Sequence, residues 1–491
     1  MLNRYQFRCL CRISDLIISK NNYNYYLVAN SALSLIRPHP VSSKDSYVVF
    51  KNRKTSIVLG LVGNLLILFL LLLISIPFGR SQKFGKKKII SNVLFISHFV
   101  NKTHMNECKD FYFGAISSGV RSAGINVTTA FINHNRTLGR DRNNQWCTIN
   151  DDSIVFERLL GLKDETRIAV SAIFSMLKLI MISLSTKSKV GRNFLLFAAS
   201  KAVSRSTLNA LRLAVQFSNL LSAHDFKTIV TTYEGHPWER LIFSVARRYS
   251  GESVTRIGYQ HAHLFEKQHA ISRDLSSEYN PDLILTAGDA GRLYLQRQMS
   301  NLTDLRILTL GSERCLEKKV LTGAGEKVGE VVLVIPEGTI EECDLLFRFC
   351  VSQAISSPKL KFVFRLHPCL TFSKLKKILS CLSDLPENVE LSERRLEEDL
   401  SIARYALYRG SSAVIQACCA GLFPIYFDDE AHLAVDPLHA VSSSRARVTS
   451  NDSVESILKI NYDCHALGQL TSYSESVYTP LRLSVIYDVL A

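Results

Sequence analysis

Four clusters of polar residues each follow a short apolar run, and their residue types are suited to acid–base and phosphate chemistry. In chain order the clusters are Tyr233-Glu234-Gly235-His236-Pro237-Trp238-Glu239, Tyr259-Gln260-His261-Ala262-His263, Arg365-Leu366-His367-Pro368 and Gly410-Ser411-Ser412. A parallel α/β sheet presents its working groups at the carboxyl ends of its strands. If each apolar run is a strand, we expect the four clusters to form the functional site.

The first cluster supplies a candidate general base. A carboxylate at a strand end beside a cleft can take a proton from an acceptor hydroxyl, and we assign this role to Glu234. The alternative is a carboxylate that only complements a helix dipole, which would suit Glu239 better. We expect the residues around the base, with two from the second cluster, to lie on the acceptor side: Tyr233, Gly235, His236, Glu239, Gln260 and His263.

The second cluster supplies an imidazole. His261 could donate a hydrogen bond to a phosphate or to an acceptor oxygen, and we count it as catalytic together with Glu234 and His367. His261 and His263 also have a spacing found in metal sites, but no set of carboxylates and cysteines accompanies them. We therefore predict no metal site and no cofactor.

The third and fourth clusters supply groups that bind anions. Arg365 and His367 after one strand, with Ser411 and Ser412 at a helix N-terminus after another, could clamp a phosphate or a pyrophosphate. The alternative is that a junction of strand, Gly-Ser-Ser and helix simply needs an N-cap. The complete set predicted to bind the donor is Arg365, His367, Pro368, Gly410, Ser411, Ser412 and Glu337.

The clusters can meet only if parallel strands alternate with helices. Apolar runs predict strands at 92–100, 125–132, 228–232, 254–259, 282–286 and 306–310 in a first half, and at 331–335, 362–366, 389–391 and 405–408 in a second half, which has one more strand ending at 427. Helices at 340–355, 373–383, 454–458 and 481–490 complete the second half.

This order of elements predicts an α/β fold with two Rossmann-like domains that face a cleft. The glycine-rich stretch 322–329 separates them. We expect an acceptor domain at 80–322 and a nucleotide-donor domain at 323–491, with ligands bound in the cleft between them.

A long uncharged run precedes both domains. Residues 57–76 contain no charged side chain, and a helix of that length reaches about 30 Å, so we predict a transmembrane helix within 55–79. Similar numbers of basic residues flank the two ends, which leaves the orientation open by the positive-inside rule. For residues 1–54 the sequence predicts no role.

The positive charge is concentrated in an insert of the first half, at 166–224. The chain has a formal net charge of +15, which favours an anionic partner, and no Asp or Glu occurs between Thr166 and His224. One interpretation is a pair of interfacial helices on anionic headgroups, and the other is a pair of core helices with a solvated basic rim. A second span at 168–184 is marginal because Lys178 interrupts it. No nucleic-acid module is recognisable, so we expect no nucleic-acid partner.

The 12 cysteines include no C-x-x-C pair, which excludes the usual signature of a zinc site. Several of them lie in apolar runs, as Cys350 and Cys418 do. Small buried thiols of this kind are typical of a reducing compartment. We therefore expect the domains to lie in the cytosol.

Taken in order, the strings YEGH, YQHAH, RLHP and RGSSA resemble the GT-B superfamily of bacterial surface-carbohydrate enzymes. Within it the chain is similar to the surface carbohydrate biosynthesis proteins. It resembles more distantly the inverting sialyl- and polysialyltransferases, the capsule Kdo transferases and the CDP-glycerol glycerophosphotransferases. The resemblance covers roughly residues 92–436.

The resemblance assigns roles to matching residues. Glu234-Gly235 matches the end of an acidic-acidic-glycine motif that carries the general base of bacterial sialyltransferases, although Tyr233 replaces the first acidic residue. His367-Pro368 matches their His-Pro motif, which contacts the cytidine nucleotide, and Ser411-Ser412 matches the serine motif that holds the donor phosphate. His261 matches a histidine of the glycerophosphotransferases.

The resemblance implies an inverting, metal-independent glycosyltransferase that moves a sugar from a cytidine-nucleotide donor to a lipid-linked or growing glycan, as in capsule or lipopolysaccharide synthesis. We expect a single-pass protein of the bacterial inner membrane with its catalytic part in the cytosol. Two other functions remain open. One is transfer of a polyol phosphate from a CDP-glycerol-type donor, and the other is a non-catalytic membrane scaffold for polysaccharide assembly.

Overall fold

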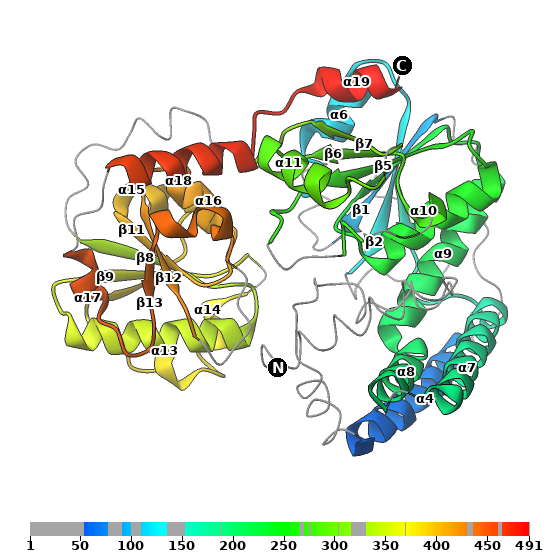
Figure 1. Cartoon of the computed structure of the whole chain (residues 1–491), viewed down its shortest axis with the longest axis horizontal. Coiled ribbons are helices and arrows are strands. Elements are labelled where there is room, and N and C mark those ends of the chain that lie inside the picture. The colour runs from blue at the N-terminus through cyan, green and yellow to red at the C-terminus, as the bar shows by residue number, and fades with distance from the viewer. Residues whose placement is uncertain are drawn as a thin grey trace.

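The computed structural model describes residues 54–76, 91–99, 110–134, 153–187, 189–265, 270–273, 275, 277–302, 304–315, 330–368, 370–429, 436–459 and 464–490. These residues form two α/β domains and a bundle of helices beside the first domain (Figure 1). The N-terminal segment, for which the sequence predicts no role, lies outside the described residues.

In the part of the chain that the structure describes, the first sheet has seven parallel strands in the order β3-β2-β1-β4-β5-β6-β7. They are β1 (Val93–Phe99), β2 (Val127–Asn133), β3 (Ser153–Phe156), β4 (Thr228–Thr232), β5 (Thr255–Gln260), β6 (Leu283–Thr286) and β7 (Arg306–Thr309). Since β1 pairs with β2 on one side and β4 on the other, the strand order reverses between β1 and β4. Such a reversal opens a crevice at the carboxyl ends of the two strands.

Helices cover both faces of this sheet, because alternate residues of each strand point to opposite sides. Leu94 and Ile96 of β1 pack with Phe217 and Ile242, whereas Phe95 packs on the other face. The helices of this domain are α6 (Ala115–Ser122), α9 (Arg205–Ala223), α10 (Pro237–Ser250), the 3-10 helix η3 (Ser277–Tyr279) and α11 (Asp289–Gln298).

The second sheet has six parallel strands among the described residues, in the order β10-β9-β8-β11-β12-β13. They are β8 (Val331–Ile335), β9 (Lys361–Arg365), β10 (Val389–Ser392), β11 (Tyr405–Tyr408), β12 (Phe423–Phe427) and β13 (Ala446–Val448). Its strand order reverses between β8 and β11. The domain also contains α13 (Ile340–Ser356), α14 (Phe372–Leu375), η4 (Ser380–Leu382), α15 (Leu396–Ile402), α16 (Ala413–Cys419), η5 (His439–Ser444) and α17 (Val454–Leu458).

The end of the chain returns from the second domain to the first. After α18 (Cys464–Val477), the segment 478–482 passes the ends of β6 and β7, where Thr479 N–H donates to the Ala287 carbonyl at 3.1 Å. The last helix, α19 (Leu483–Leu490), then packs on the first sheet with α6 (Figure 1). We predicted that this helix completes the second half, and that prediction is wrong: Ile486 is buried against the first sheet.

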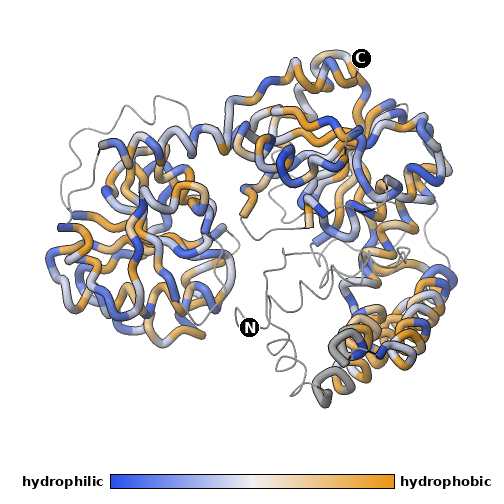
Figure 2. Tube along the Cα trace, viewed as in Figure 1, coloured by the Kyte–Doolittle hydropathy of each residue, from blue (hydrophilic) through white to orange (hydrophobic). Residues whose placement is uncertain are grey.

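A bundle of three helices extends from the first domain (Figure 1). They are α4 (Lys54–Ser75), α7 (Leu162–Ser185) and α8 (Lys189–Ala202), and one apolar cluster joins them. Figure 2 shows that hydrophobic residues cover much of α4 and α7. The insert predicted at 166–224 therefore consists of α7, α8 and α9, and α9 packs first in the bundle, through Leu208 and Leu211, and then on the sheet, through Phe217 and Leu220.

The predicted arrangement of two parallel-sheet α/β domains is confirmed by the structure. Short strands and one helix depart from the prediction. β3 and β13 were not predicted, and β13 has only three residues, too few to show a period. The helix expected at 373–383 is wrong, since only α14 and η4 form there.

Candidate active site

Glu234 lies in the loop between β4 and α10, at the point where the order of the first sheet reverses. Tyr233 extends the strand, because its backbone N–H donates to the Tyr259 carbonyl at 2.8 Å. Gly235 then turns the chain with φ of 80°, and a Cβ there would overlap the backbone of Ala270. The loop can therefore take this path only with glycine at position 235.

Glu239 fixes the loop from the first turn of α10. Its carboxylate accepts hydrogen bonds from the backbone N–H of Glu234 at 3.0 Å and of His236 at 2.7 Å. Burial, which outweighs the opposing charge of His236, raises the pKa of Glu239 to about 7. The prediction that Glu239 faces an acceptor is wrong, since the carboxylate is only 1% exposed. Glu239 instead has the alternative role that we gave it from the sequence, a carboxylate at a helix N-terminus that complements the helix dipole.

Two further acceptor-side predictions are also wrong, because the side chains point into the domain. Tyr233 is 0% exposed, and Arg240 lies over its ring at 5.2 Å from the centroid. Gln260 is 3% exposed, and its Nε2 donates to the Ala262 carbonyl. A strand end predicts which residues are close to a site, but not which of their side chains face it.

Glu234 is held between two histidines. Its Oε2 lies 2.9 Å from His236 Nε2, and its Oε1 lies 3.6 Å from His261 Nε2. Burial alone would raise the pKa of Glu234, but the hydrogen bond from His236 and the neighbouring imidazoles lower it to about 2. The hydrogen bond to Glu234 raises the pKa of His236 to about 9, against the burial that would lower it. Glu234 and His236 therefore form an ion pair at neutral pH.

His261 is a neutral imidazole beside this ion pair. Burial lowers its pKa to about 4, although the charge of Glu234 acts in the opposite direction. Tyr112 packs edge-on against the ring, with centroids 5.1 Å apart. A neutral imidazole keeps one lone pair and can accept a proton there. The cluster thus contains one carboxylate, one positive histidine and one histidine that can act as a base.

Two histidines that we did not select from the sequence complete this group. His98, near the end of β1, has its Nδ1 2.9 Å from His134 Nε2 and its Nε2 3.3 Å from Thr232 Oγ1. Burial and the neighbouring His134 lower the pKa of His98 to about 3. Both residues could have been selected from the sequence, because working groups lie at the carboxyl ends of parallel strands, and His98 and His134 lie at the ends of β1 and β2.

Glu337 and Gly410 are in contact at the reversal point of the second sheet, after β8 and β11. A Cβ on Gly410 would overlap the Glu337 carboxylate, so only glycine leaves room for it. Burial and the charge of Glu342 raise the pKa of Glu337 to about 7, against the opposing charge of Arg409. Glu337 can therefore change its charge near neutral pH.

Ser411 and Ser412 follow Gly410 and precede α16. Ser412 occupies the N-cap position, but its side chain makes no capping hydrogen bond. The N-cap alternative therefore does not account for this serine. Ser411 is 8% exposed, and its carbonyl accepts from the Val414 N–H at 3.3 Å.

Arg365 does not serve as the clamp that we predicted, because it is engaged inside the second domain. Its Nη1 donates to Asp399 Oδ2 at 2.7 Å and to the Arg394 carbonyl at 2.6 Å. Asp399 is 0% exposed and also accepts from Ser392 Oγ. Arg365 thus shares the buried carboxylate of Asp399 with Arg394, and the local string RLHP gives no sign of this pairing.

The two domains meet beside these residues. The ring of His263 lies 6.4 Å from the ring of His439 and 6.4 Å from that of Tyr473, which belong to η5 and α18. Arg314, after β7, contributes to lowering the pKa of both His261 and His367, in each case after the effect of burial. One cation of the first domain thus acts on a candidate base and on a candidate phosphate ligand. His367 and the neighbouring Pro368 are exposed after β9.

In the ranges that the structure describes, no group of three or more His, Cys, Asp or Glu side chains is arranged to hold a metal ion. Glu234 and His261 are side chains that can transfer a proton, and Arg314, His367 and Ser411 are side chains that can bind an anion.

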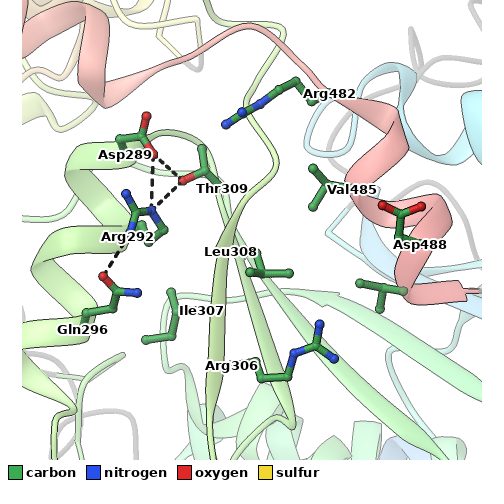
Figure 3. Close-up of a pocket in the computed structure, with 11 residues that line it drawn as sticks. Asp289, Arg292, Gln296, Arg306, Ile307, Leu308, Thr309, Arg482, Val485 and Asp488 are labelled. Carbon is green, nitrogen blue, oxygen red and sulfur yellow. Dashed lines mark hydrogen bonds and ion pairs between the residues drawn. The ribbon is translucent and has the colours of Figure 1, made fainter.

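A groove of about 580 Å³ lies elsewhere, between β7, α11 and α19 (Figure 3). Asp289, Arg292 and Thr309 form a hydrogen-bonded group at its side, with Thr309 Oγ1 donating to Asp289 Oδ1 at 2.7 Å. No residue of the predicted site lines this groove. We therefore separate it from the candidate active site.

Comparison with known proteins gives no family for the chain. No protein-family model and no curated protein matches its sequence. A solved UDP-GlcNAc 2-epimerase from Neisseria meningitidis bound to UDP-GlcNAc is similar in structure, with TM-score 0.43 and 11% identity over 81% of this chain and 99% of that one. A UDP-GlcNAc 2-epimerase from Methanocaldococcus jannaschii has TM-score 0.40 and 10% identity over 81% and 99%. The glycotransferase of kitacinnamycin has TM-score 0.42 and 11% identity over 81% and 97%. These likenesses assign no activity to the chain.

Proposed function

We propose that the chain is a membrane-anchored glycosyltransferase, which moves a sugar from a nucleotide donor of the cytidine type to a lipid-linked or growing surface glycan. The observation that best supports this function is the position of two ionisable groups. Glu234 with His261 lies at the reversal point of the first sheet, and Glu337 with Gly410 and Ser411 lies at that of the second. Reversal points are where doubly wound sheets bind their ligands.

In this proposal the acceptor hydroxyl loses its proton while its oxygen attacks the anomeric carbon of the donor. The bond from that carbon to the donor phosphate breaks, and the phosphate leaves with the electron pair. In this proposal the proton goes to His261, because burial lowers its pKa and keeps the imidazole neutral. Against the effect of burial, the hydrogen bond from His236 lowers the pKa of Glu234 and keeps that carboxylate ionised. Glu234 then orients and stabilises the imidazolium, as the carboxylate does in other His–carboxylate pairs.

The leaving phosphate needs positive or hydrogen-bonding partners. Arg314, His367 and the hydroxyls of Ser411 and Ser412 supply them in this proposal, while Arg365 only supports the second domain. Glu337 lies against Gly410 beside the same strand ends, where its protonated form could donate to the nucleotide. The proposed setting is the cytosolic side of a bacterial inner membrane, in the synthesis of capsule or lipopolysaccharide.

The neutral state of His261 also favours a second candidate, transfer of a polyol phosphate from a CDP-glycerol-type donor. In that reaction the acceptor oxygen attacks phosphorus, His261 takes its proton, and CMP leaves. The two candidates share residues but differ in the bond that is broken. Product analysis separates them.

The experiment starts with the full chain in detergent and a thermal-shift screen of CMP, CDP, UDP and GDP. Stabilisation by a cytidine nucleotide is expected, because a ligand that binds only the folded state raises its melting temperature. Transfer is then measured with CMP-sugars and with CDP-glycerol. Stabilisation by UDP or GDP alone would refute the cytidine donor, and turnover of CDP-glycerol without sugar transfer would select the second candidate. If no nucleotide changes the melting temperature, the remaining function is the non-catalytic membrane scaffold for polysaccharide assembly.

A further inference from the structure

The helix α7 carries two apolar stripes on opposite faces. The inner stripe packs in the bundle through Ile168, Ala172, Met176 and Leu179. The outer stripe has the helical spacing of four and three residues and is exposed, with Val170 61%, Phe174 69%, Leu177 49%, Met181 70% and Leu184 74% accessible. A helix on a water-facing surface would carry polar residues there, so the outer face of α7 fits an apolar solvent.

The helix α4 has the same division. Its inner side packs in the bundle through Leu61, Leu65, Leu68 and Leu72. Its outer side is apolar and exposed at Leu59, Val62, Leu66, Phe69, Leu70, Leu73 and Ile74. Apolar exposure on two neighbouring helices amounts to one surface rather than scattered single residues.

Polar groups of the two helices are satisfied within the bundle. Asn64 Nδ2 of α4 donates to the Ser200 carbonyl of α8 at 2.8 Å. Ser75 Oγ donates to the Leu72 carbonyl at 2.7 Å, and Ser183 Oγ of α7 donates to the Ile180 carbonyl at 2.6 Å. Internal satisfaction of polar groups is required where the surroundings offer no hydrogen bonds, as in hydrocarbon.

Length and charge favour a bilayer over a second copy of the chain as the occupant of this surface. α4 has 22 residues and α7 has 24, so at ~1.5 Å per residue both reach the ~30 Å of a hydrocarbon core. The exposed charges on and next to α7 after Arg167 are basic, at Lys178, Lys187 and Arg192. Two copies would bring these charges together, whereas anionic headgroups would neutralise them. The long stem of Lys178 can carry its charge towards the headgroups.

We propose that the outer faces of α4 and α7 form one lipid-contacting surface, so that α7 is a second membrane-embedded helix of the anchor. The proposal extends the single-helix anchor of the proposed function and does not rest on sugar transfer. A buried ion pair joins this surface to the sheet domain, since Arg212 of α9 donates to both oxygens of Glu165 in α7 at 2.6 and 2.9 Å. In this proposal the ion pair fixes the position of the first sheet relative to the bilayer.

The test places one added tryptophan on each surface of the full-length chain. The variants are Phe174→Trp on α7, Leu66→Trp on α4 and, as a control in water, Tyr249→Trp on α10, where Tyr249 is exposed. Each protein is reconstituted into vesicles of equal parts phosphatidylcholine and phosphatidylglycerol, with and without bromine on the acyl chains. The emission of the native tryptophans, measured on the unmutated chain, is subtracted.

The expected result is that brominated chains remove most of the added emission at positions 174 and 66 and leave that at 249 unchanged. Aqueous iodide should give the opposite pattern. Quenching at 66 without quenching at 174 would overturn the proposal and leave α4 as a single helix anchor. Protection of position 174 from both quenchers, with crosslinking between copies, would show instead that a second chain covers α7.

Discussion

His236 Nε2 lies 2.9 Å from Glu234 Oε2, and the other oxygen of the same carboxylate lies 3.6 Å from His261 Nε2. One carboxylate thus serves two imidazoles in different charge states, since the pKa of His236 rises to about 9 while that of His261 falls to about 4. The positive histidine holds the carboxylate in place, and the neutral one remains able to accept a proton. This division of roles is the basis of the first two predictions.

Replacing Glu234 with Gln should reduce the turnover number by about 10²–10⁴-fold, the usual contribution of general acid–base catalysis. His261→Gln should cost a similar factor, and the double variant little more than either single one, because the two side chains act as a unit. The matched control is Glu252→Gln, an exposed carboxylate of the same domain. Full activity of Glu234→Gln would refute the proposed role of Glu234 in orienting and stabilising the imidazolium of His261.

The ion pair between Glu234 and His236 should give stability over a limited pH range. The pKa of Glu234 is lowered to about 2, so its contribution is complete above about 4.5 and is lost as the pH falls towards 2. The pKa of His236 is raised to about 9, so its contribution is complete below about 6.5 and is lost as the pH rises towards 9. The difference in melting temperature between the unmutated chain and His236→Gln should be largest at pH 4.5–6.5. A difference that does not depend on pH would contradict the ion pair.

Gly235→Ala should destabilise the protein more than Gly124→Ala. Both glycines have positive φ, at 80° and 83°, so both substitutions carry backbone strain on the order of 1–2 kcal/mol. Only at position 235 does the new Cβ also meet the backbone of Ala270, while nothing lies within 4 Å at position 124. Denaturant unfolding measures the difference. Equal costs would show that the loop after β4 can move aside.

Arg212→Met should destabilise the contact between α9 and α7, which connects the helical bundle to the sheet domain. It leaves Glu165, 2% exposed, without its bidentate partner, and breaking a buried pair in this way costs about 3–5 kcal/mol. Arg348→Met is the control, since its pair with Asp344 is exposed at the surface, where solvent screens the interaction and its contribution to stability is small. Hydrogen exchange in α7 should increase only in Arg212→Met.

Binding of a nucleotide should weaken as the pH rises through about 7, because the pKa of Glu337 is raised to about that value by burial and by Glu342. Below pH 7 the protonated carboxyl can donate to the ligand, whereas the ionised form repels a phosphate. Glu337→Gln should bind with nearly constant affinity between pH 6 and 8. Calorimetric titration with CMP at several pH values measures this, and an unchanged pH dependence in the variant would exclude Glu337.

The sequence predicted the two sheets and that the candidate residues follow strand ends, because buried parallel strands are apolar runs and their ends are marked by polar residues. It could not predict which side chains face inward. Tyr233 precedes Glu234 directly and Glu239 follows it by five residues. The side chain of Tyr233 is nevertheless buried against Arg240, and that of Glu239 is buried against backbone N–H groups. Arg365 matched a phosphate-binding pattern, and its partner Asp399 lies too far along the chain for any local motif to include it.

The helical insert shows a different limit. Its periodicity predicted helices, and the alternatives of an interfacial pair and a core pair were left open. The two stripes of α7 explain why the sequence could not decide between an interfacial pair and a core pair of helices. Met176 packs in the bundle and Met181 lies on the exposed face, although both are the same apolar residue. Both stripes are apolar, and the pattern alone contains no sign of which one meets protein.

The return of the chain through α18 to α19 ties the last helix to the first domain, because the N–H groups of Thr479 and Arg482 donate to the carbonyls of Ala287 and Leu310. A label at the carboxyl terminus therefore reports on the position of the first domain, although it follows the second in the chain.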